Sequence, residues 1–426
     1  VWERVLEIQH RFYSGQHPAL ATTHYDYASL FLRRGEYDKA AEHLQSSLQI
    51  TEQSLGKTHA DYFGRLVRLA RCLYEQQEYL RAQKVLEEAE DLQNAIFGDS
   101  PHPFIARMLQ LQSEILRRLG RFDDALAAID RAIAMKEAIY GTKEHPSIAE
   151  ALEVKVRIFH HLGERIEAKS LIEGALKIRR KAYGENHPEV SRSIHDLGSY
   201  YLRLGQYAEA IEQFEQARQI TAAVFGERHP DYVERTLNLA NARNEQGEYQ
   251  LALGLVEDIR EALPVGNHYL KARWLQLMGE LQRRMGQFDT AMDYIGQAIA
   301  MKTAIYGTKD HPSVAEALEI QGKIHDHLGE FDQEQLVWED ILKIQSEFYS
   351  EQHPALATTY HDYANLHVRK GEYTEALELL DKSLDITEQS LGKIHASYFG
   401  RLILRAACLY EQQAYSQAQK VLEEAE

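Results

Sequence analysis

The segment His187–Pro230, HPEVSRSIHDLGSYYLRLGQYAEAIEQFEQARQITAAVFGERHP, decides the fold of this chain. It begins with His-Pro, and proline is favoured at the first position of a helix because it lacks only a donor that has no partner there. Apolar and small residues recur at helical spacing up to Gly205, and a second such run follows from Tyr207 to Phe225. Gly226 suits the left-handed position just past a helix end. The segment therefore predicts two amphipathic helices joined by a tight turn.

The same unit recurs along the whole chain of 426 residues. The landmark histidine that opens each unit stands at His17, His59, His102, His145, His187, His229, His268, His311, His353 and His395, so the gaps are 42, 43, 43, 42, 42, 39, 43, 42 and 42 residues. The turn position follows 18 residues later in every copy: Gly35, Gln77, Gly120, Gly163, Gly205, Gly247, Gly286, Gly329, Gly371 and Gln413. A helix pair cannot bury both apolar faces alone, so this periodicity predicts a solenoid.

We therefore expect an all-α protein with a single continuous solenoid over residues 1–426. A partial repeat at 1–16 precedes repeats that start near 17, 59, 102, 145, 187, 229, 268, 311 and 353, and a truncated last repeat covers 395–426.

Small residues mark the positions where two helices approach closely. Five residues after the turn position every copy has alanine except one, which has Glu334. Adding bulk at such a position typically costs about 1–3 kcal/mol. We interpret Glu334 as a carboxylate that reaches out to solvent from a loosened joint, and a functional contact is the alternative.

The pattern Leu197-Gly198, Tyr201, Gly205, Ala210, Phe214 and Ala217 resembles the tetratricopeptide repeat. The period of 42 residues, with an aromatic-Gly pair and then His-Pro between repeats, resembles the kinesin light chain type rather than the type of about 34 residues. The resemblance covers essentially the whole chain. It implies a right-handed α-solenoid superhelix of about ten repeats, in which the first helix of each repeat lines a concave surface.

Two stretches longer than one repeat also recur in the sequence. Residues 1–90 recur at 337–426 with 62 of 90 positions identical, and residues 131–153 recur at 297–319. Tandem duplication explains both.

The regular pattern fails near Pro264–His268, where the loop is shorter, the aromatic-Gly pair is missing and Tyr269 replaces proline. Pro264 should end the preceding helix early, which predicts a locally altered packing angle or a hinge.

Composition excludes several classes of function. The net charge of −17 argues against binding to nucleic acid, which needs a basic surface. No apolar run is long enough for a membrane span. The two cysteines, Cys72 and Cys408, occupy equivalent positions and are expected to be reduced and buried, as in a cytoplasmic protein. The start at Val1 without methionine suggests a fragment of a longer protein.

The remaining motifs predict neither a metal site nor a cofactor. The landmark histidines are best explained as helix caps or loop packing. Glu153 with His160, or Glu319 with Asp326 and His327, matches no zinc motif, since a helical pair of metal ligands needs i, i+4 spacing. No nucleophile elbow or dinucleotide fingerprint occurs. We therefore expect a protein that is not an enzyme.

The outward side chains of the first helices are the candidate binding residues, because the resemblance places these helices on the concave surface. They are Arg107, Gln110, Glu114, Arg117, Glu153, Arg157, His161, Arg192, His195, Ser199, Arg203, Asn241, Asn244, Arg273, Gln276, Glu280, Arg283 and Arg284. Basic and acidic bands alternate among them. Since arginine can clamp a carboxylate through two hydrogen bonds, such a groove suits a protein or peptide segment of mixed charge.

The sequence therefore predicts a noncatalytic scaffold that holds a partner protein in its groove. Two alternatives stay open. The array can be the sensor arm of a larger signalling protein, such as an NTPase or protease, or it can associate with itself end to end, because the uncapped ends of a solenoid expose apolar surface.

Overall fold

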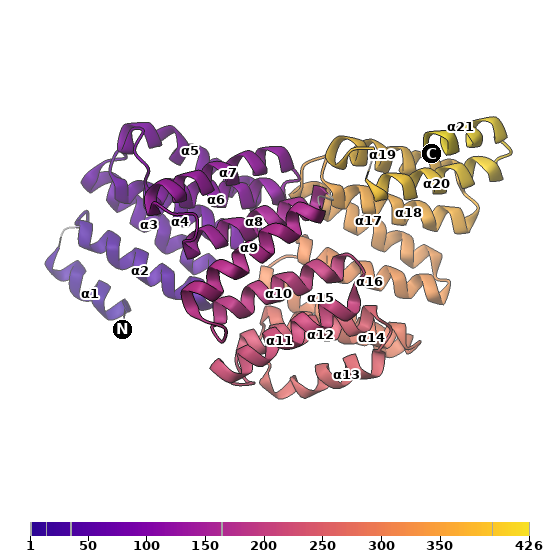
Figure 1. Ribbon diagram of the computed structural model, residues 1–426, viewed down its shortest axis with the longest axis horizontal. Helices are drawn as coiled ribbons and strands as arrows, with labels where there is room; N and C mark the ends of the chain where they lie inside the picture. Colours follow the sequence, from indigo (N-terminus) through magenta and orange to yellow (C-terminus); the bar gives the residue numbers. More distant parts are fainter. Residues whose placement is uncertain (1, 14, 35, 163–164, 394, 426) are drawn as a thin grey trace. The chain divides into compact units, whose positions relative to one another are not determined.

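The computed structural model describes residues 2–13, 15–34, 36–162, 165–393 and 395–425, with the side chains of 33, 160, 161, 165, 166, 396 and 425 left out. Within these residues the chain forms twenty-one α-helices and one short 3-10 helix, without a strand (Figure 1). It divides into two compact units, Val1–Ile158 and Phe159–Glu426, and the boundary falls inside helix α8. The predicted all-α repeat fold is confirmed.

The first unit alternates second and first helices of the repeats. The second helices are α1 (Trp2–Phe12), α3 (Tyr37–Leu55), α5 (Tyr79–Phe97) and α7 (Phe122–Tyr140), and the first helices are α2 (Pro18–Arg34), α4 (Ala60–Glu75), α6 (Pro103–Arg118) and α8 (Pro146–Leu162). Each described pair packs side by side, as α2 and α3 do in Figure 1.

The second unit continues the same alternation. Its first helices are α10 (Pro188–Arg203), α12 (Pro230–Glu245), α14 (Tyr269–Arg284), α16 (Pro312–Leu328), α18 (Pro354–Lys370) and α20 (Ala396–Glu411). Its second helices are α9 (Arg165–Tyr183), α11 (Tyr207–Phe225), α13 (Tyr249–Asp258), α15 (Phe288–Tyr306), α17 (Phe331–Phe348), α19 (Tyr373–Leu391) and α21 (Tyr415–Ala425), and the 3-10 helix η1 (Arg260–Ala262) follows α13. The quoted segment forms α10 and α11 as predicted.

The landmark histidines cap the first helices. In all ten, the imidazole Nδ1 accepts a hydrogen bond from the backbone N–H two residues later, at 3.1–3.2 Å. The cap satisfies a donor that the helix leaves unpaired. In seven repeats the aromatic ring before the loop stacks on the histidine, with ring centroids 3.5–4.4 Å apart. This explains why the aromatic residue and the histidine recur together.

The turn positions require a left-handed backbone. Gly205 has φ of 70°, and the two copies without glycine, Gln77 and Gln413, have φ of 61° and 64°. The backbone conformation is therefore kept where the residue differs, at the steric cost that a side chain bears there.

Glycines inside first helices allow close packing. A Cβ atom on Gly198 would lie 2.8 Å from the Phe214 ring, and one on Gly279 would lie 2.6 Å from Ile295 Cδ1. Both neighbours are fully buried. The close approach of first and second helices predicted from the small residues is thus present.

Glu334 is the exception, and the interpretation of a carboxylate reaching solvent is wrong. The residue is 2% exposed. Its carboxylate accepts from Arg369 Nη2 at 2.6 and 2.7 Å and from Trp338 Nε1 at 3.1 Å. A buried carboxylate must be paired, and the guanidinium from α18 reaches across to pair it. The joint is closed by this ion pair rather than loosened.

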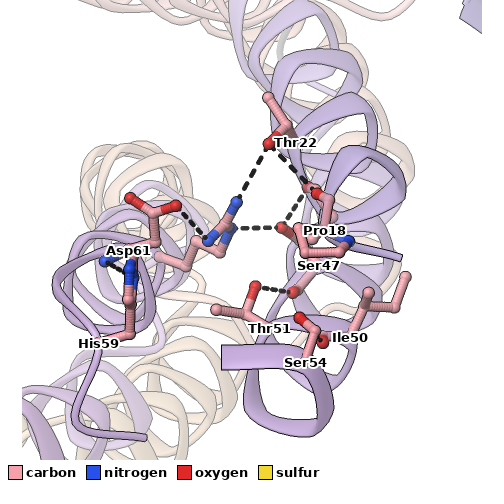
Figure 2. A network of polar contacts seen from close by, with 10 residues as sticks. Pro18, Thr22, Ser47, Ile50, Thr51, Ser54, His59 and Asp61 are labelled. Carbon is pink, nitrogen blue, oxygen red and sulfur yellow. Dashed lines mark hydrogen bonds and ion pairs between the residues drawn. The ribbon is translucent and has the colours of Figure 1, made fainter. Parts of the chain in front are cut away.

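Buried arginines replace apolar contacts at a few joints. Arg65 on α4 donates from Nε to Ser47 Oγ at 2.8 Å and lies 3.4 Å from Asp61, while Ser47 donates to the Ala21 carbonyl at 2.6 Å (Figure 2). The duplicate in the second unit repeats the contact, since Arg401 Nε donates to Ser383 Oγ at 2.6 Å. The duplication of residues 1–90 at 337–426 therefore preserves a buried polar network as well as the apolar core.

The irregular joint has a shortened second helix. Helix α13 has 10 residues where α11 has 19. The α-helix ends at Asp258, and Leu263 before Pro264 is extended, as proline requires of its neighbour. His268 still caps α14. The predicted early helix end is confirmed.

Candidate functional site

The first-helix face of the second unit carries an open cavity of about 430 Å³. We use "first-helix face" for the surface formed by α10, α12, α14 and α16. The cavity is lined by α12, α14, α15 and α16, and four predicted site residues border it: Asn241, Arg273, Gln276 and Glu280. It lies within the size range of pockets that bind small ligands or single side chains of a peptide.

Arg273 links two first helices at the rim of this cavity. Its guanidinium lies 3.2 Å from the Glu234 carboxylate and donates to Asn238 Oδ1 at 2.9 Å, both on α12. The Asn238 amide is also 2.7 Å from His195 Nε2 on α10. Burial lowers the pKa of His195, so its imidazole is neutral at pH 7. The residues form a polar ladder that crosses three repeats.

Glu280 is held by two arginines of its own helix. Arg283 donates to it at 2.7 and 2.8 Å, and Arg284 donates at 2.8 Å. Burial would raise the pKa of Glu280, but these hydrogen bonds outweigh burial and keep the pKa below its usual value. Arg283 is only 9% exposed, so its guanidinium serves to hold Glu280 in place rather than to contact a partner. Arg284 also lies 3.5 Å from Glu245 on α12 and is exposed.

Lys302 closes the floor of the cavity and was missed by the sequence reasoning. Its ammonium donates to Gln276 Oε1 at 2.6 Å, to the Ser313 carbonyl at 2.5 Å and to Glu316 at 3.2 Å. The residue is buried, and burial lowers its pKa. The sequence did not indicate Lys302 because the candidate binding residues come from first helices, and Lys302 lies on a second helix, α15. A lysine inside the apolar run AIAMK is the feature that could have revealed it.

The first unit repeats this lysine clamp. Lys136 on α7 donates to Gln110 Oε1 at 2.5 Å and to the Ser147 carbonyl at 2.7 Å. Burial lowers its pKa to about 8. Arg107, one turn before Gln110 on α6, is exposed. The duplication of 131–153 at 297–319 thus has a direct structural counterpart.

Several predicted site residues of the first unit are buried rather than outward-facing. Glu114 accepts from Arg71 on the preceding first helix at 3.2 Å. Arg117 is buried, and burial followed by the charge of Arg118 lowers its pKa to about 10. Glu153 is buried too, whereas Arg157 is half-buried. The contact of Glu114 with Arg71 comes from another repeat, which the helical pattern of one repeat could not show.

The other predicted residues lie on α10, α12 and the end of α8. Arg192 is exposed and pairs with Glu189 at 2.8 Å, Ser199 is half-buried, and Arg203 is exposed. Asn244 is buried and donates to Glu245 at 3.3 Å. The side chain of His161 lies outside the described residues.

Acidic residues lie on α16, the last helix of the first-helix face, and on the next first helix, α18. Burial raises the pKa of Glu319 to about 7, and burial also raises the pKa of Asp362. In the described part of the chain no group of three or more His, Cys, Asp or Glu side chains could hold a metal ion. None of the described helices is long and apolar enough to cross a membrane.

Comparison with known proteins identifies the repeat. One tetratricopeptide repeat model matches residues 1–53, 65–138, 147–223, 195–263, 232–304, 337–389 and 357–426, and a second matches 111–168. No curated protein matches the chain.

Solved structures of repeat proteins are similar over part of the chain. A putative kinesin light chain with nearly identical TPR-like repeats from Podospora anserina is 26% identical, with 47% of this chain and 95% of that one covered and a TM-score of 0.40. BtubC (BKLC) from P. vanneervenii is 19% identical, with coverage of 57% and 90% and a TM-score of 0.41. A tetratricopeptide repeat protein from Parabacteroides merdae is 14% identical, with coverage of 70% and 99% and a TM-score of 0.45. From the family models, which match most of its length, the chain belongs to the tetratricopeptide repeat family.

Proposed function

We propose that the first-helix face of the second unit binds a segment of another protein that carries both acidic and basic side chains. Tetratricopeptide repeats generally mediate protein–protein interactions. The observation that carries the finer proposal is the open cavity of about 430 Å³, whose lining includes Arg273 and Lys302 together with Glu280 and Glu316.

The ion pair between Arg273 and Glu234 at the rim of this cavity is still accessible to a partner. Arg273 is 39% exposed in its side chain, and its partner Glu234 is 32% exposed. A partner carboxylate can therefore replace one member of the pair without leaving a buried charge, which is the condition for a favourable interfacial ion pair. The half-buried apolar residues Ile305 and Ile320 line the same cavity and supply apolar surface for the partner to contact. The site suits a short peptide stretch rather than a flat protein surface.

A selection of random peptides tests the proposal. Peptides of twelve residues displayed on phage would be selected for binding to the whole chain. The affinity of the selected peptides would then be measured by calorimetry. Peptides that carry both signs of charge should be enriched, and Arg273→Glu should weaken their binding by about tenfold or more. Arg284→Glu should weaken binding as well, because this guanidinium is the more exposed of the two arginines that hold Glu280.

The matched control is Arg228→Glu. Arg228 is exposed on the loop between α11 and α12 and lies outside the cavity. Helicity by circular dichroism should be the same in all three variants. Selected peptides that bind Arg273→Glu and Arg284→Glu as tightly as the parent chain would overturn the assignment of this face.

A further inference from the structure

One buried arginine of the second unit has no partner in the described part of the chain. Arg235 on α12 is 9% exposed, and its Nε is shielded from solvent. No described residue gives its guanidinium a hydrogen bond or an ion pair. A buried charge left alone is costly, so buried charges are normally paired. The guanidinium of Arg235 is therefore available to an anion from outside the chain.

Two arginines at the same position of other repeats show how the chain itself can satisfy such a group. Arg65 and Arg401, like Arg235, stand six residues after a landmark histidine. Arg65 donates from Nε to Ser47 on the preceding second helix at 2.8 Å and from Nη2 to Thr22 on the preceding first helix at 3.5 Å (Figure 2). Arg401 makes the same two contacts at 2.6 and 3.4 Å. The position thus directs a guanidinium toward the two preceding helices.

Both acceptors are missing beside Arg235. Counted from the landmark histidine, the serine position is occupied by Ala217 and the threonine position by Arg192. The serine of this joint lies on α10 instead, where Ser191 donates to the Ala217 carbonyl at 2.8 Å. Asp231, one turn earlier on α12, forms no ion pair with Arg235 either. The joint is closed without using Arg235, and a second cation stands where the other copies have an acceptor.

The joint between α10 and α12 is consequently rich in cations. Arg192 is exposed and pairs with Glu189 at 2.8 Å, and the same carboxylate lies 3.4 Å from the buried Arg179. Burial and the charge of Arg235 both lower the pKa of His195, which places the guanidinium near α10. One carboxylate therefore serves three guanidiniums at this joint, although the whole chain has a net charge of −17.

We propose that Arg235 and Arg192 together bind an oxyanion of the partner segment, either the carboxylate of an acidic side chain or the phosphate of a phosphorylated one. A guanidinium presents parallel N–H donors that match two oxygens of either group. Asn238, one turn after Arg235 on α12, lines the cavity of about 430 Å³, so a segment seated there lies close to both arginines. The inference rests on the proposed function of the first-helix face, and it names a charge that the partner segment must carry.

A titration with two simple anions tests this site without a peptide. The chain with ¹⁵N-labelled arginine would be titrated with acetate and with inorganic phosphate at constant ionic strength, and the Nε–H resonances followed by NMR. The resonance of Arg235, identified by its loss in Arg235→Lys, should shift until it saturates. The resonance of Arg401, identified by its loss in Arg401→Lys, should not shift, because its Nε already donates to Ser383. The anion that binds more tightly distinguishes a carboxylate from a phosphate.

A double-mutant cycle tests the same site with the peptides selected on the whole chain. Replacing one acidic residue of the peptide by its amide should weaken binding to the parent chain by about tenfold, the range of a charged hydrogen bond. The same replacement should have less than a twofold effect on binding to Arg235→Gln. A peptide with phosphoserine at that position provides the phosphate arm of the comparison.

The matched control is Arg401→Gln, at the same position of another repeat. It should bind the selected peptides like the parent chain, and its midpoint in urea should fall because it loses hydrogen bonds within the chain. The midpoint of Arg235→Gln should not fall, since Arg235 has no such bonds to lose.

The two experiments separate this inference from the proposed function. If no peptide is selected but the Arg235 resonance shifts, the groove proposal fails and the anion site stands. If peptides bind through Arg273 while the Arg235 resonance is unmoved by both anions and the cycle shows no coupling, the anion site is overturned and the groove proposal stands. Equal shifts of the Arg235 and Arg401 resonances would also overturn the site, because they would show a general effect of anions on the chain.

Discussion

Replacing Gly279 with alanine places a methyl group in the contact between α14 and α15. The new Cβ would lie 2.6 Å from Ile295 Cδ1, 2.7 Å from Ile295 Cγ1 and 3.3 Å from the Ala291 carbonyl oxygen. Ile295 is fully buried in a core cluster with Ala291 and Ile324. Its side chain therefore has little room to turn away, and the two helices must separate or Ile295 must leave its rotamer.

The expected magnitude follows from two opposed effects. Overpacking of this kind costs about 1–3 kcal/mol, whereas alanine in place of glycine inside a helix gains about 1 kcal/mol. Gly279→Ala should therefore lose up to about 2 kcal/mol of unfolding free energy. Gly296 is a matched control, since it lies on α15 with nothing within 4 Å of its added Cβ. Gly296→Ala should gain up to about 1 kcal/mol, so the variants should differ by about 1–3 kcal/mol.

The assay must report on this repeat, because a repeat array need not unfold in one step. Urea titration followed by the fluorescence of Trp274, which lies on the same helix as Gly279, supplies a local reading once the other two tryptophans, Trp2 and Trp338, are replaced by phenylalanine. Hydrogen exchange of the α14 and α15 amides supplies a second. The double variant Gly279→Ala, Ile295→Val removes the atom that the new methyl group meets first, so part of the loss should be recovered.

Two results would refute this reasoning. If Gly279→Ala is as stable as Gly296→Ala, the contact between the helices is looser than the distances state. If Ile295→Val costs the same in the parent and in Gly279→Ala, the two residues are not coupled. Either result would mean that small residues are kept at this position for a reason other than close packing.

Three further predictions concern turns, charge and pH. Gln77→Gly and Gln413→Gly should each raise stability by about 0.5–1 kcal/mol in urea titration, because both glutamines hold a left-handed φ. Glu334→Gln should cost about 1–3 kcal/mol and Arg369→Met about 3–5 kcal/mol by the same measurement, since only the second leaves a carboxylate buried without its cation. Burial and His43 lower the pKa of His24 from 6.5 to about 4, so the unfolded chain binds a proton that the folded chain excludes. Stability should therefore fall as pH drops below 6.5, and His24→Gln should flatten this slope.

The elements of the fold could be predicted because each is decided within one repeat. A landmark histidine caps its own helix, a turn glycine sets its own φ, and Pro264 acts on its own chain neighbours. These are local effects of backbone geometry, and the sequence displays them directly. Ten copies of the same pattern make each assignment secure.

The candidate site could be predicted only in outline, because its electrostatics depend on neighbouring repeats. Glu334 looked like a surface carboxylate until Arg369, 35 residues later, supplied its cation. Lys302 was not among the predicted site residues, because Gln276 and the Ser313 carbonyl, which enclose its ammonium, belong to other helices. A helical pattern identifies the face on which a residue lies, but it does not show which side chain of the next repeat covers it.

The same dependence would make the proposed groove selective for its partner. Arg273 pairs with Glu234 across 39 residues, and Arg71 pairs with Glu114 across 43, so charges on adjacent first helices compensate one another. A partner that enters must offer a charge wherever it breaks such a pair, because a desolvated charge left alone costs several kcal/mol. A segment with the wrong order of charges is penalised at every repeat it touches. Discrimination between partners then grows with the number of repeats engaged, although each exposed pair contributes little by itself.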